Sequence, residues 1–256
     1  MELEGKTVII TSNSTVFLKL TKSLIENSSK SRSDFIIVAE NGLTFKERFW
    51  KRKEKIGILS ASDEWLFTLY ESIFNHWKRA EKKYLDEIDI TSFSPDILTD
   101  SVNKSNVNVL SLLENYEANS IISIGSGYIP IKVLNLFNLK VNIHPGILPF
   151  YKGLGSPEAI MKGDVFNIGW SIHELISKID AGSIFEKKKI NYSLLKKLTF
   201  AEVYIYLYKD AIDNFFLPQK DEDKSLEFDS NEILKNLTFL KFTNYLTYKI
   251  KRLFIH

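Results

Sequence analysis

The chain contains no cysteine among its 256 residues, which excludes disulfide bonds, thiolate metal ligands and a cysteine nucleophile. It has no marked excess of charge of either sign, because 34 basic residues balance 32 acidic ones and leave a net charge of +2. A nucleic-acid partner is therefore not expected. No histidine, aspartate or glutamate residues cluster at metal-ligand spacing, so no metal site is expected either.

Long apolar runs are also missing. No run approaches the roughly 20 residues that a membrane-spanning helix needs, and the N-terminus lacks the pattern of a signal peptide. We therefore expect a cytoplasmic protein with no membrane span. The hydrophobic share of 44% and the aromatic share of 13% are enough for a substantial core.

Short β-branched runs alternate with helical patterns in the first part of the chain. Residues 7–10 are typical of a buried strand, and the polar turn after them can cap a helix over about 16–27. A second strand is expected over 35–38. This strand–helix–strand order predicts an α/β protein with a Rossmann-like fold, in which helices flank a mostly parallel sheet.

The same alternation continues along the chain. A helix capped by Ser62 is expected over 63–83, and a strong helix over 199–216. Further strands are expected over 120–124, 139–143, 168–175 and 183–190. The polar stretch 218–224 is the best linker candidate, and it divides the chain into a large domain, residues 1–217, and a small C-terminal appendage, residues 218–256.

Two polar side chains stand at the end of one expected strand. Asn142 and His144 are two residues apart, so they project from the same face of a strand. An acidic turn, Asp180-Ala181-Gly182, follows further on. Two hydrogen-bond donors and a carboxylate base are what acyl transfer to an amine requires. Taken alone, the pair is also compatible with polar groups that satisfy a strand end, and Asp180 with an ordinary turn.

A series of spaced motifs extends this pattern between about residues 120 and 190. They are Asn142-Ile143-His144, Leu148-Pro149, Tyr151-Lys152-Gly153, Gly169-Trp170-Ser171-Ile172-His173 and Asp180-Ala181-Gly182. In this order they resemble the folate-dependent formyltransferases. The resemblance implies an enzyme with the Rossmann-like formyltransferase fold, whose catalytic domain is residues 1–217. It also implies transfer of a formyl group from 10-formyltetrahydrofolate to an amine, with no metal.

The resemblance implies roles for particular residues. Asn142 and His144 would donate hydrogen bonds to the developing oxyanion, and Asp180 would take the proton of the amine or hold His144 in the useful protonation state. The segment Gly125-Ser126-Gly127-Tyr128-Ile129 resembles the stretch whose backbone lines the folate pocket. The loop Tyr151-Lys152-Gly153 is expected to contact the substrate.

Three further positions, 146, 152 and 173, stand outside the expected catalytic trio. His173 is interpreted as a structural histidine within its strand. The family pattern often has Ser where this chain has Gly146, and often Arg where it has Lys152. A lysine lacks the bidentate fork of an arginine, so a contact carried over to that position is weaker.

The branch of the family is a separate question. Enzymes that formylate nucleotide-linked deoxyamino sugars, such as a dTDP-4-amino-4,6-dideoxyhexose, have about this length and serve surface polysaccharides, including the O-antigen of lipopolysaccharide. We favour this small-molecule substrate class. A methionyl-tRNA formyltransferase, a purine-precursor formyltransferase and a formyltetrahydrofolate hydrolase stay open as alternatives.

The last residues interleave aromatic and basic side chains. Such a segment, residues 237–255, fits a contact between copies of the chain, a helix docked on its own domain or a helix on a membrane surface. The resemblance implies the first, a possible homodimer through the C-terminal region.

Overall fold

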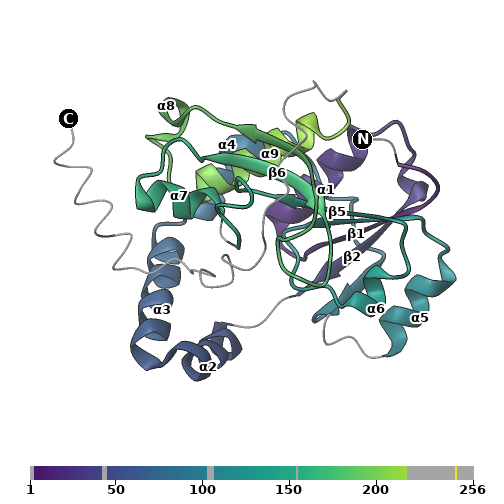
Figure 1. The fold of residues 1–256 in the computed structure, drawn as a ribbon, viewed down its shortest axis with the longest axis horizontal. Coiled ribbons are helices and arrows are strands. Elements are labelled where there is room, and N and C mark those ends of the chain that lie inside the picture. The colour runs from purple at the N-terminus through teal and green to yellow at the C-terminus, as the bar shows by residue number, and fades with distance from the viewer. Residues whose placement is uncertain (1–2, 42–44, 103–106, 154, 218–245, 247–256) are drawn as a thin grey trace.

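Seven strands form one sheet, and helices pack against both of its faces (Figure 1). The structure is a computed structural model, and it describes residues 3–41, 45–102, 107–153, 155–217 and 246. The strands are β1 (Thr7–Ser12), β2 (Phe35–Glu40), β3 (Ile97–Thr99), β4 (Ser120–Ile124), β5 (Leu139–His144), β6 (Gly169–Glu174) and β7 (Ile184–Lys189). The α-helices are α1 (Thr15–Glu26), α2 (Phe45–Ile56), α3 (Ile58–Ile73), α4 (His76–Leu85), α5 (Val107–Asn115), α6 (Ile131–Leu134), α7 (Ser156–Lys162), α8 (Tyr192–Leu195) and α9 (Phe200–Asn214).

The sheet is mostly parallel. Its strand order is β3-β2-β1-β4-β5-β6-β7, with parallel pairing from β3 to β5 and antiparallel pairing of β6 with both β5 and β7. The chain therefore builds outward from β1 to β3 and then returns to place β4 on the other side of β1. A crevice at the carboxyl ends of the strands is expected where the order reverses, between β1 and β4. The predicted α/β, Rossmann-like fold class is confirmed.

The strand side chains alternate between two parts of the core. Ile9 belongs to the cluster that packs with α1, α4 and α9, whereas Val8 and Ile10 belong to the cluster that packs with α5 and α6. Because both faces are covered, β1, β2 and β4 read as continuous apolar runs rather than alternating ones. Burial on both faces also explains why composition alone predicts these strands.

The helix expected over 63–83 is two helices. Asn75, between α3 and α4, adopts a left-handed conformation with φ of 52°. Asparagine tolerates this conformation better than most residues because its short polar side chain bonds locally. Ser62 lies inside α3 rather than at its N-cap, which is Gly57. The prediction was wrong here because the apolar spacing continues across the break.

The helix expected over 199–216 is confirmed as α9. Its N-cap is Thr199, whose side chain accepts a hydrogen bond from the backbone N–H of Glu202, and the Glu202 side chain accepts one from the backbone of Thr199 in return. This capping box fixes where the helix begins. The apolar face of α9 then packs against β5, β6, α1 and α4.

The C-terminal part of the chain was predicted to be a separate appendage. The linker 218–224 and the appendage 218–256 lie outside the described residues, apart from Leu246, so this division stays a prediction. None of the helices among the described residues combines the length and the apolar character that crossing a membrane requires.

Candidate active site

The carboxyl end of β5 carries the first two candidate residues. β5 lies between β4, which pairs Ser123 with Asn142, and β6, which pairs His173 with Asn142. Asn142 and His144 are separated by the apolar, buried Ile143 and so share one face of the strand. His144 is buried, whereas Asn142 keeps partial access to solvent.

Asp180 reaches this strand end from the loop between β6 and β7. Its Oδ1 atom lies 3.5 Å from Asn142 Nδ2, and its Oδ2 atom lies 3.8 Å from His144 Nδ1. The backbone N–H of Gly153 donates a hydrogen bond of 2.8 Å to Oδ2 and holds the carboxylate in this position. Asp180 has a φ of 47°, a left-handed conformation that the neighbouring contacts stabilise. The three side chains named from sequence spacing thus meet, although their catalytic roles stay a prediction.

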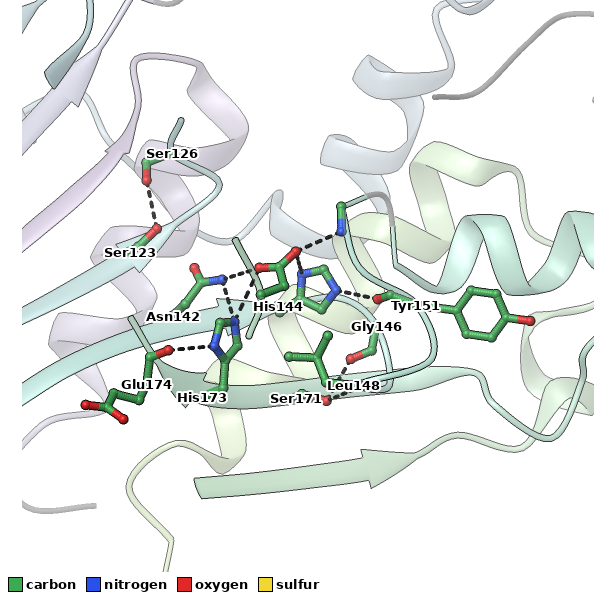
Figure 2. Close-up of polar contacts among 12 residues, drawn as sticks. Ser123, Ser126, Asn142, His144, Gly146, Leu148, Tyr151, Ser171, His173 and Glu174 are labelled. Carbon is green, nitrogen blue, oxygen red and sulfur yellow. Dashed lines mark hydrogen bonds and ion pairs between the residues drawn. The ribbon is translucent and has the colours of Figure 1, made fainter. Parts of the chain in front are cut away.

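His173 is a fourth member of this cluster (Figure 2). Its Nδ1 atom lies 2.8 Å from the carbonyl oxygen of Glu174, which only accepts, so Nδ1 carries a proton. In the neutral ring Nε2 then accepts a hydrogen bond of 2.9 Å from Asn142 Nδ2. The same Nε2 lies 3.4 Å from Asp180 Oδ1. The interpretation of His173 as a structural histidine stays a prediction, and the contact with Asn142 arises because strand register places the two residues opposite each other.

The imidazole of His144 is fixed in one tautomer. Its Nε2 atom lies 2.7 Å from the carbonyl oxygen of Tyr151, so Nε2 carries the proton and Nδ1 of the neutral ring faces Asp180. Burial lowers the pKa of His144, and the nearby charge of Asp180 only partly opposes this. Burial alone would raise the pKa of Asp180, but the positive charge that His144 gains in acid, the neighbouring His173 and the Gly153 N–H together hold that pKa below its ordinary value. At neutral pH the site therefore holds a neutral imidazole beside an ionised carboxylate.

Comparison with known proteins identifies the family. A family model described as "Formyl transferase" matches residues 6–204, more than half of the chain. This chain belongs to the formyl transferase family. A methionyl-tRNA formyltransferase of Lactococcus lactis is 32% identical over 99 residues, which are 38% of this chain and 30% of the relative. The corresponding protein of Natranaerobius thermophilus is 28% identical over 179 residues, or 64% of this chain and 54% of the relative.

A solved structure supports the same fold. The phosphoribosylglycinamide formyltransferase of Anaplasma phagocytophilum aligns with a TM-score of 0.51 at 14% identity, covering 82% of this chain and 84% of the other. The chain spans only about a third to a half of the length of the curated relatives it matches, 30% and 54% in the two cases above.

The loop after His144 explains one departure of this chain from the family pattern. Ser171 Oγ donates a hydrogen bond of 2.8 Å to the carbonyl of Gly146 and accepts one of 3.0 Å from the N–H of Leu148 (Figure 2). A Cβ atom at Gly146 would lie 2.5 Å from the Cα of Gly155 and 2.7 Å from the carbonyl oxygen of Tyr151. The two glycines approach each other too closely for any side chain, so a serine does not fit at this position.

The side chain of Tyr151 and the residues Lys152 and Gly153, which form the loop expected to contact substrate, lie in different places. The ring of Tyr151 points away from Asn142 and His144 (Figure 2), and its hydroxyl donates a hydrogen bond of 2.8 Å to Asp164. Burial raises the pKa of this hydroxyl. Tyr151 thus contributes its carbonyl oxygen to the site, and the substrate contact expected of this residue stays a prediction.

Lys152 and Gly153 stay close to the cluster. Burial lowers the pKa of Lys152, Asp180 raises it in part, and the neighbouring Lys178 lowers it further. The Lys152 ammonium therefore interacts with both the carboxylate of Asp180 and the ammonium of Lys178. Gly153 contributes its backbone N–H to that carboxylate, as described above.

The segment proposed to line the folate pocket follows β4, the strand beside β5. Gly125 has a φ of 62°, and a Cβ atom there would lie only 2.0 Å from the ring of Phe17. Ser126 Oγ is 2.7 Å from Ser123 Oγ, and the N–H of Gly127 donates a hydrogen bond of 2.8 Å to Glu40.

The last two residues of this segment differ in exposure. Tyr128 is 40% exposed, whereas Ile129 is buried in the core. Tyr128 and the glycine backbone can therefore be reached by a ligand, but the side chain of Ile129 cannot. Among the described residues, no group of three or more histidine, aspartate or glutamate side chains is arranged to hold a metal ion.

Proposed function

We propose that this protein transfers a formyl group from 10-formyltetrahydrofolate to the amino group of a nucleotide-linked deoxyamino sugar. The observation that carries the proposal is the carboxylate of Asp180, which stands between Asn142 Nδ2 at 3.5 Å and His144 Nδ1 at 3.8 Å. Membership of the formyl transferase family supplies the group that is transferred.

Asn142 acts on the carbonyl oxygen of the formyl group. In this reaction the amine nitrogen bonds to the formyl carbon, the bond from that carbon to the donor nitrogen breaks, and negative charge develops on the oxygen in between. Asn142 Nδ2 has two protons, and His173 Nε2 holds one of them at 2.9 Å. The second has only the 3.5 Å contact with Asp180, so it is available to the oxyanion.

His144 and Asp180 act on the proton, so in this proposal His144 does not make the oxyanion hydrogen bond that the resemblance implied for it. The attacking amine must lose one proton, and the leaving nitrogen must gain one. His144 presents an unprotonated Nδ1 atom, because its Nε2 proton is bound to the Tyr151 carbonyl. Nδ1 can accept the proton of the amine and pass it to the leaving nitrogen. Asp180, 3.8 Å away and ionised, stabilises the imidazolium that exists between these two events.

The formyl donor fits beside β4. The Gly125–Ile129 segment offers a glycine backbone and the exposed ring of Tyr128 at the carboxyl end of the strand next to β5. Glycine permits close approach to a flat pterin, and an aromatic ring can pack against it. When bound there, 10-formyltetrahydrofolate supplies an activated formyl carbon to Asn142 and His144.

The charges near Asp180 favour an anionic acceptor. Lys152 lies close enough to Lys178 and to Asp180 for its charge to interact with both. A pair of ammonium groups suits the diphosphate of a nucleotide-linked sugar, such as a dTDP-4-amino-4,6-dideoxyhexose. Such a sugar would serve the O-antigen of lipopolysaccharide, and the reaction would then take place in the cytoplasm.

A second candidate is formylation of methionyl-tRNA. It is favoured by the curated relatives, since both described above carry that name. Binding of tRNA depends on many contacts between phosphates and cations and weakens steeply with salt. The near balance of 34 basic and 32 acidic residues gives no such excess of charge.

One experiment separates these functions. Purified protein is supplied with 10-formyltetrahydrofolate and, in parallel, with amino-sugar nucleotides, glycinamide ribonucleotide, methionyl-tRNA or no amine, and the products are identified by mass. We expect a formylated amino-sugar nucleotide, absent when Asp180→Asn replaces the wild type. Formylated methionyl-tRNA alone would establish the second candidate, and release of formate without an amine would identify a hydrolase.

A further inference from the structure

Glu40 lies at the end of β2 and is 6% exposed. Its Oε1 atom accepts a hydrogen bond of 2.6 Å from the N–H of Val102, and its Oε2 atom accepts one of 2.8 Å from the N–H of Gly127. Its carbonyl oxygen accepts a third, of 2.7 Å, from the N–H of Asn13. One residue at the end of β2 therefore joins the chain segments that follow β1, β3 and β4.

The chemistry of this arrangement makes the segments depend on Glu40. A buried carboxylate is stable only when its oxygens are hydrogen-bonded, and hydrogen bonds to a charged acceptor are stronger than neutral ones. Here two donors come from backbone N–H groups of separate segments, 62 and 87 residues away in sequence. An acidic residue at the end of the second strand of a Rossmann-like sheet often binds a ribose. In this chain both carboxylate oxygens are directed to the protein backbone instead.

The position of Gly127 gives this bond its functional meaning. Gly127 belongs to the Gly125–Ile129 segment, which follows the carboxyl end of β4, between β1 and the strand that carries Asn142. Ser123 holds the segment at Ser126, and Glu40 holds it one residue further on. We propose that Glu40 is a positioning residue, which keeps this segment in the shape that receives the formyl donor. This inference rests on the function proposed above.

The test compares a substitution of Glu40, at the end of β2, with one of Asp96, directly before the neighbouring strand β3. Glu40→Gln keeps the size of the side chain but turns an amide N–H₂ toward one of the two backbone N–H groups. Asp96→Asn is the matched control, because Asp96 Oδ2 accepts a hydrogen bond of 2.7 Å from the N–H of Ile37, also on β2, and pairs with Arg32 at 2.9 Å. Both variants lose a carboxylate that links β2 to another segment by a backbone hydrogen bond. Only the carboxylate of Glu40 contacts the segment proposed to bind the donor.

We measure binding of folinic acid by calorimetry, KM for 10-formyltetrahydrofolate, kcat and the melting temperature. Glu40→Gln should weaken folinic acid binding and raise KM for the donor by about tenfold or more. KM for the amine should not change, and kcat at saturating donor should change far less than KM. Asp96→Asn should lower the melting temperature and leave folinic acid binding as in the wild type.

Two results would overturn the inference: Glu40→Gln that binds folinic acid as tightly as the wild type, or Asp96→Asn that loses as much affinity as Glu40→Gln. If the wild type itself neither binds folinic acid nor transfers formyl, the proposed function fails and this inference fails with it. If Glu40→Gln does not fold, amide hydrogen exchange in the wild type replaces the comparison. Slow exchange of the Gly127 amide, slowed further by folinic acid, supports the inference, and rapid exchange that the ligand leaves unchanged contradicts it.

Discussion

Among the described residues, buried histidine–carboxylate contacts occur at two places, one around Glu71 and one around Asp180, and the two places are built in opposite ways. His76 Nδ1 lies 2.9 Å from Glu71 Oε1, and the two residues are five positions apart, on either side of the turn between α3 and α4. His144 Nδ1 lies 3.8 Å from Asp180 Oδ2, and these residues come from a strand end and a distant loop.

The surroundings of the two pairs differ as much as their distances. His76 stacks on the ring of Phe74 at 5.8 Å and meets the edge of Tyr70 at 5.2 Å, so aromatic side chains enclose the pair. Asp180 instead receives a backbone hydrogen bond from Gly153 and lies next to Asn142 and His173. A short, local, enclosed pair closes a helix turn, whereas a longer contact with several polar neighbours leaves an imidazole nitrogen able to exchange a proton.

The largest expected effect on activity comes from neutralising Asp180, and neutralising Glu71 is the comparison. Asp180→Asn should lower kcat/KM for formyl transfer by about 1000-fold, because the imidazolium of His144 loses its ionised partner. Glu71→Gln should leave kcat/KM unchanged and lower the melting temperature instead. Steady-state kinetics and thermal melts of both variants check this. Equal losses of activity would mean that the two pairs do not differ in the way described.

The next largest effect concerns Asn142, which contacts Asp180 in the site. Asn142→Ala should lower kcat by about 100- to 1000-fold, since one oxyanion donor is removed, with little change in KM. Asn75→Ala is the counterpart in the helix turn, and it should cost about 1 kcal/mol of stability through its left-handed backbone without affecting kcat. Rates near those of the wild type for Asn142→Ala would remove Asn142 from the mechanism.

His173 should give a smaller loss. His173→Gln releases the Asn142 amide from the 2.9 Å bond that orients it, and we expect kcat to fall roughly tenfold. His76→Gln removes an imidazole of similar burial and should leave kcat as in the wild type. The kcat values of the two variants, measured at saturating substrates, decide the matter, and indistinguishable values would show that His173 does not orient Asn142.

The smallest effect is on the pH dependence of stability. The pKa of His144 is below its ordinary value of 6.5 in the folded protein, so the unfolded chain binds a proton first as the pH falls. Stability should therefore decrease as the pH falls below about 6.5 and level off below the folded pKa. Asp180, whose folded pKa is also lowered, adds a further loss only below its ordinary value of 3.8.

Melting temperatures between pH 7.5 and pH 5 measure this dependence. His144→Gln removes the proton-binding group and should flatten the curve in that range, relative to the wild type. A wild-type melting temperature that rises on acidification in this range would contradict the expected loss of stability.

Several features of the fold and of the site were accessible from the sequence. Strands β1, β2 and β4 are β-branched and buried on both faces, so composition alone indicates them. The pair Asn142 and His144 followed from the two-residue period of a strand. The single helix expected over 63–83 was wrong, because a left-handed residue at Asn75 interrupts the chain without interrupting the apolar period.

Other features required the folded chain. His173 enters the site because antiparallel pairing of β6 with β5 places it opposite Asn142. The sequence of either strand alone does not determine this register. Glu40 accepts hydrogen bonds from three segments at the carboxyl ends of the strands, including one 87 residues away in sequence. The buried direction of the Tyr151 ring likewise depends on Asp164, which sits beyond the end of α7.

The sequence by itself determined the local elements and the residue types available for chemistry, since these depend on side chains a few positions apart. Only the tertiary structure decided which nitrogen of His144 faces Asp180, which side chain orients the Asn142 amide and which groups bond the Gly125–Ile129 segment. Those features depend on contacts between distant strands and loops, and the free energy of such contacts exists only once the sheet has been assembled.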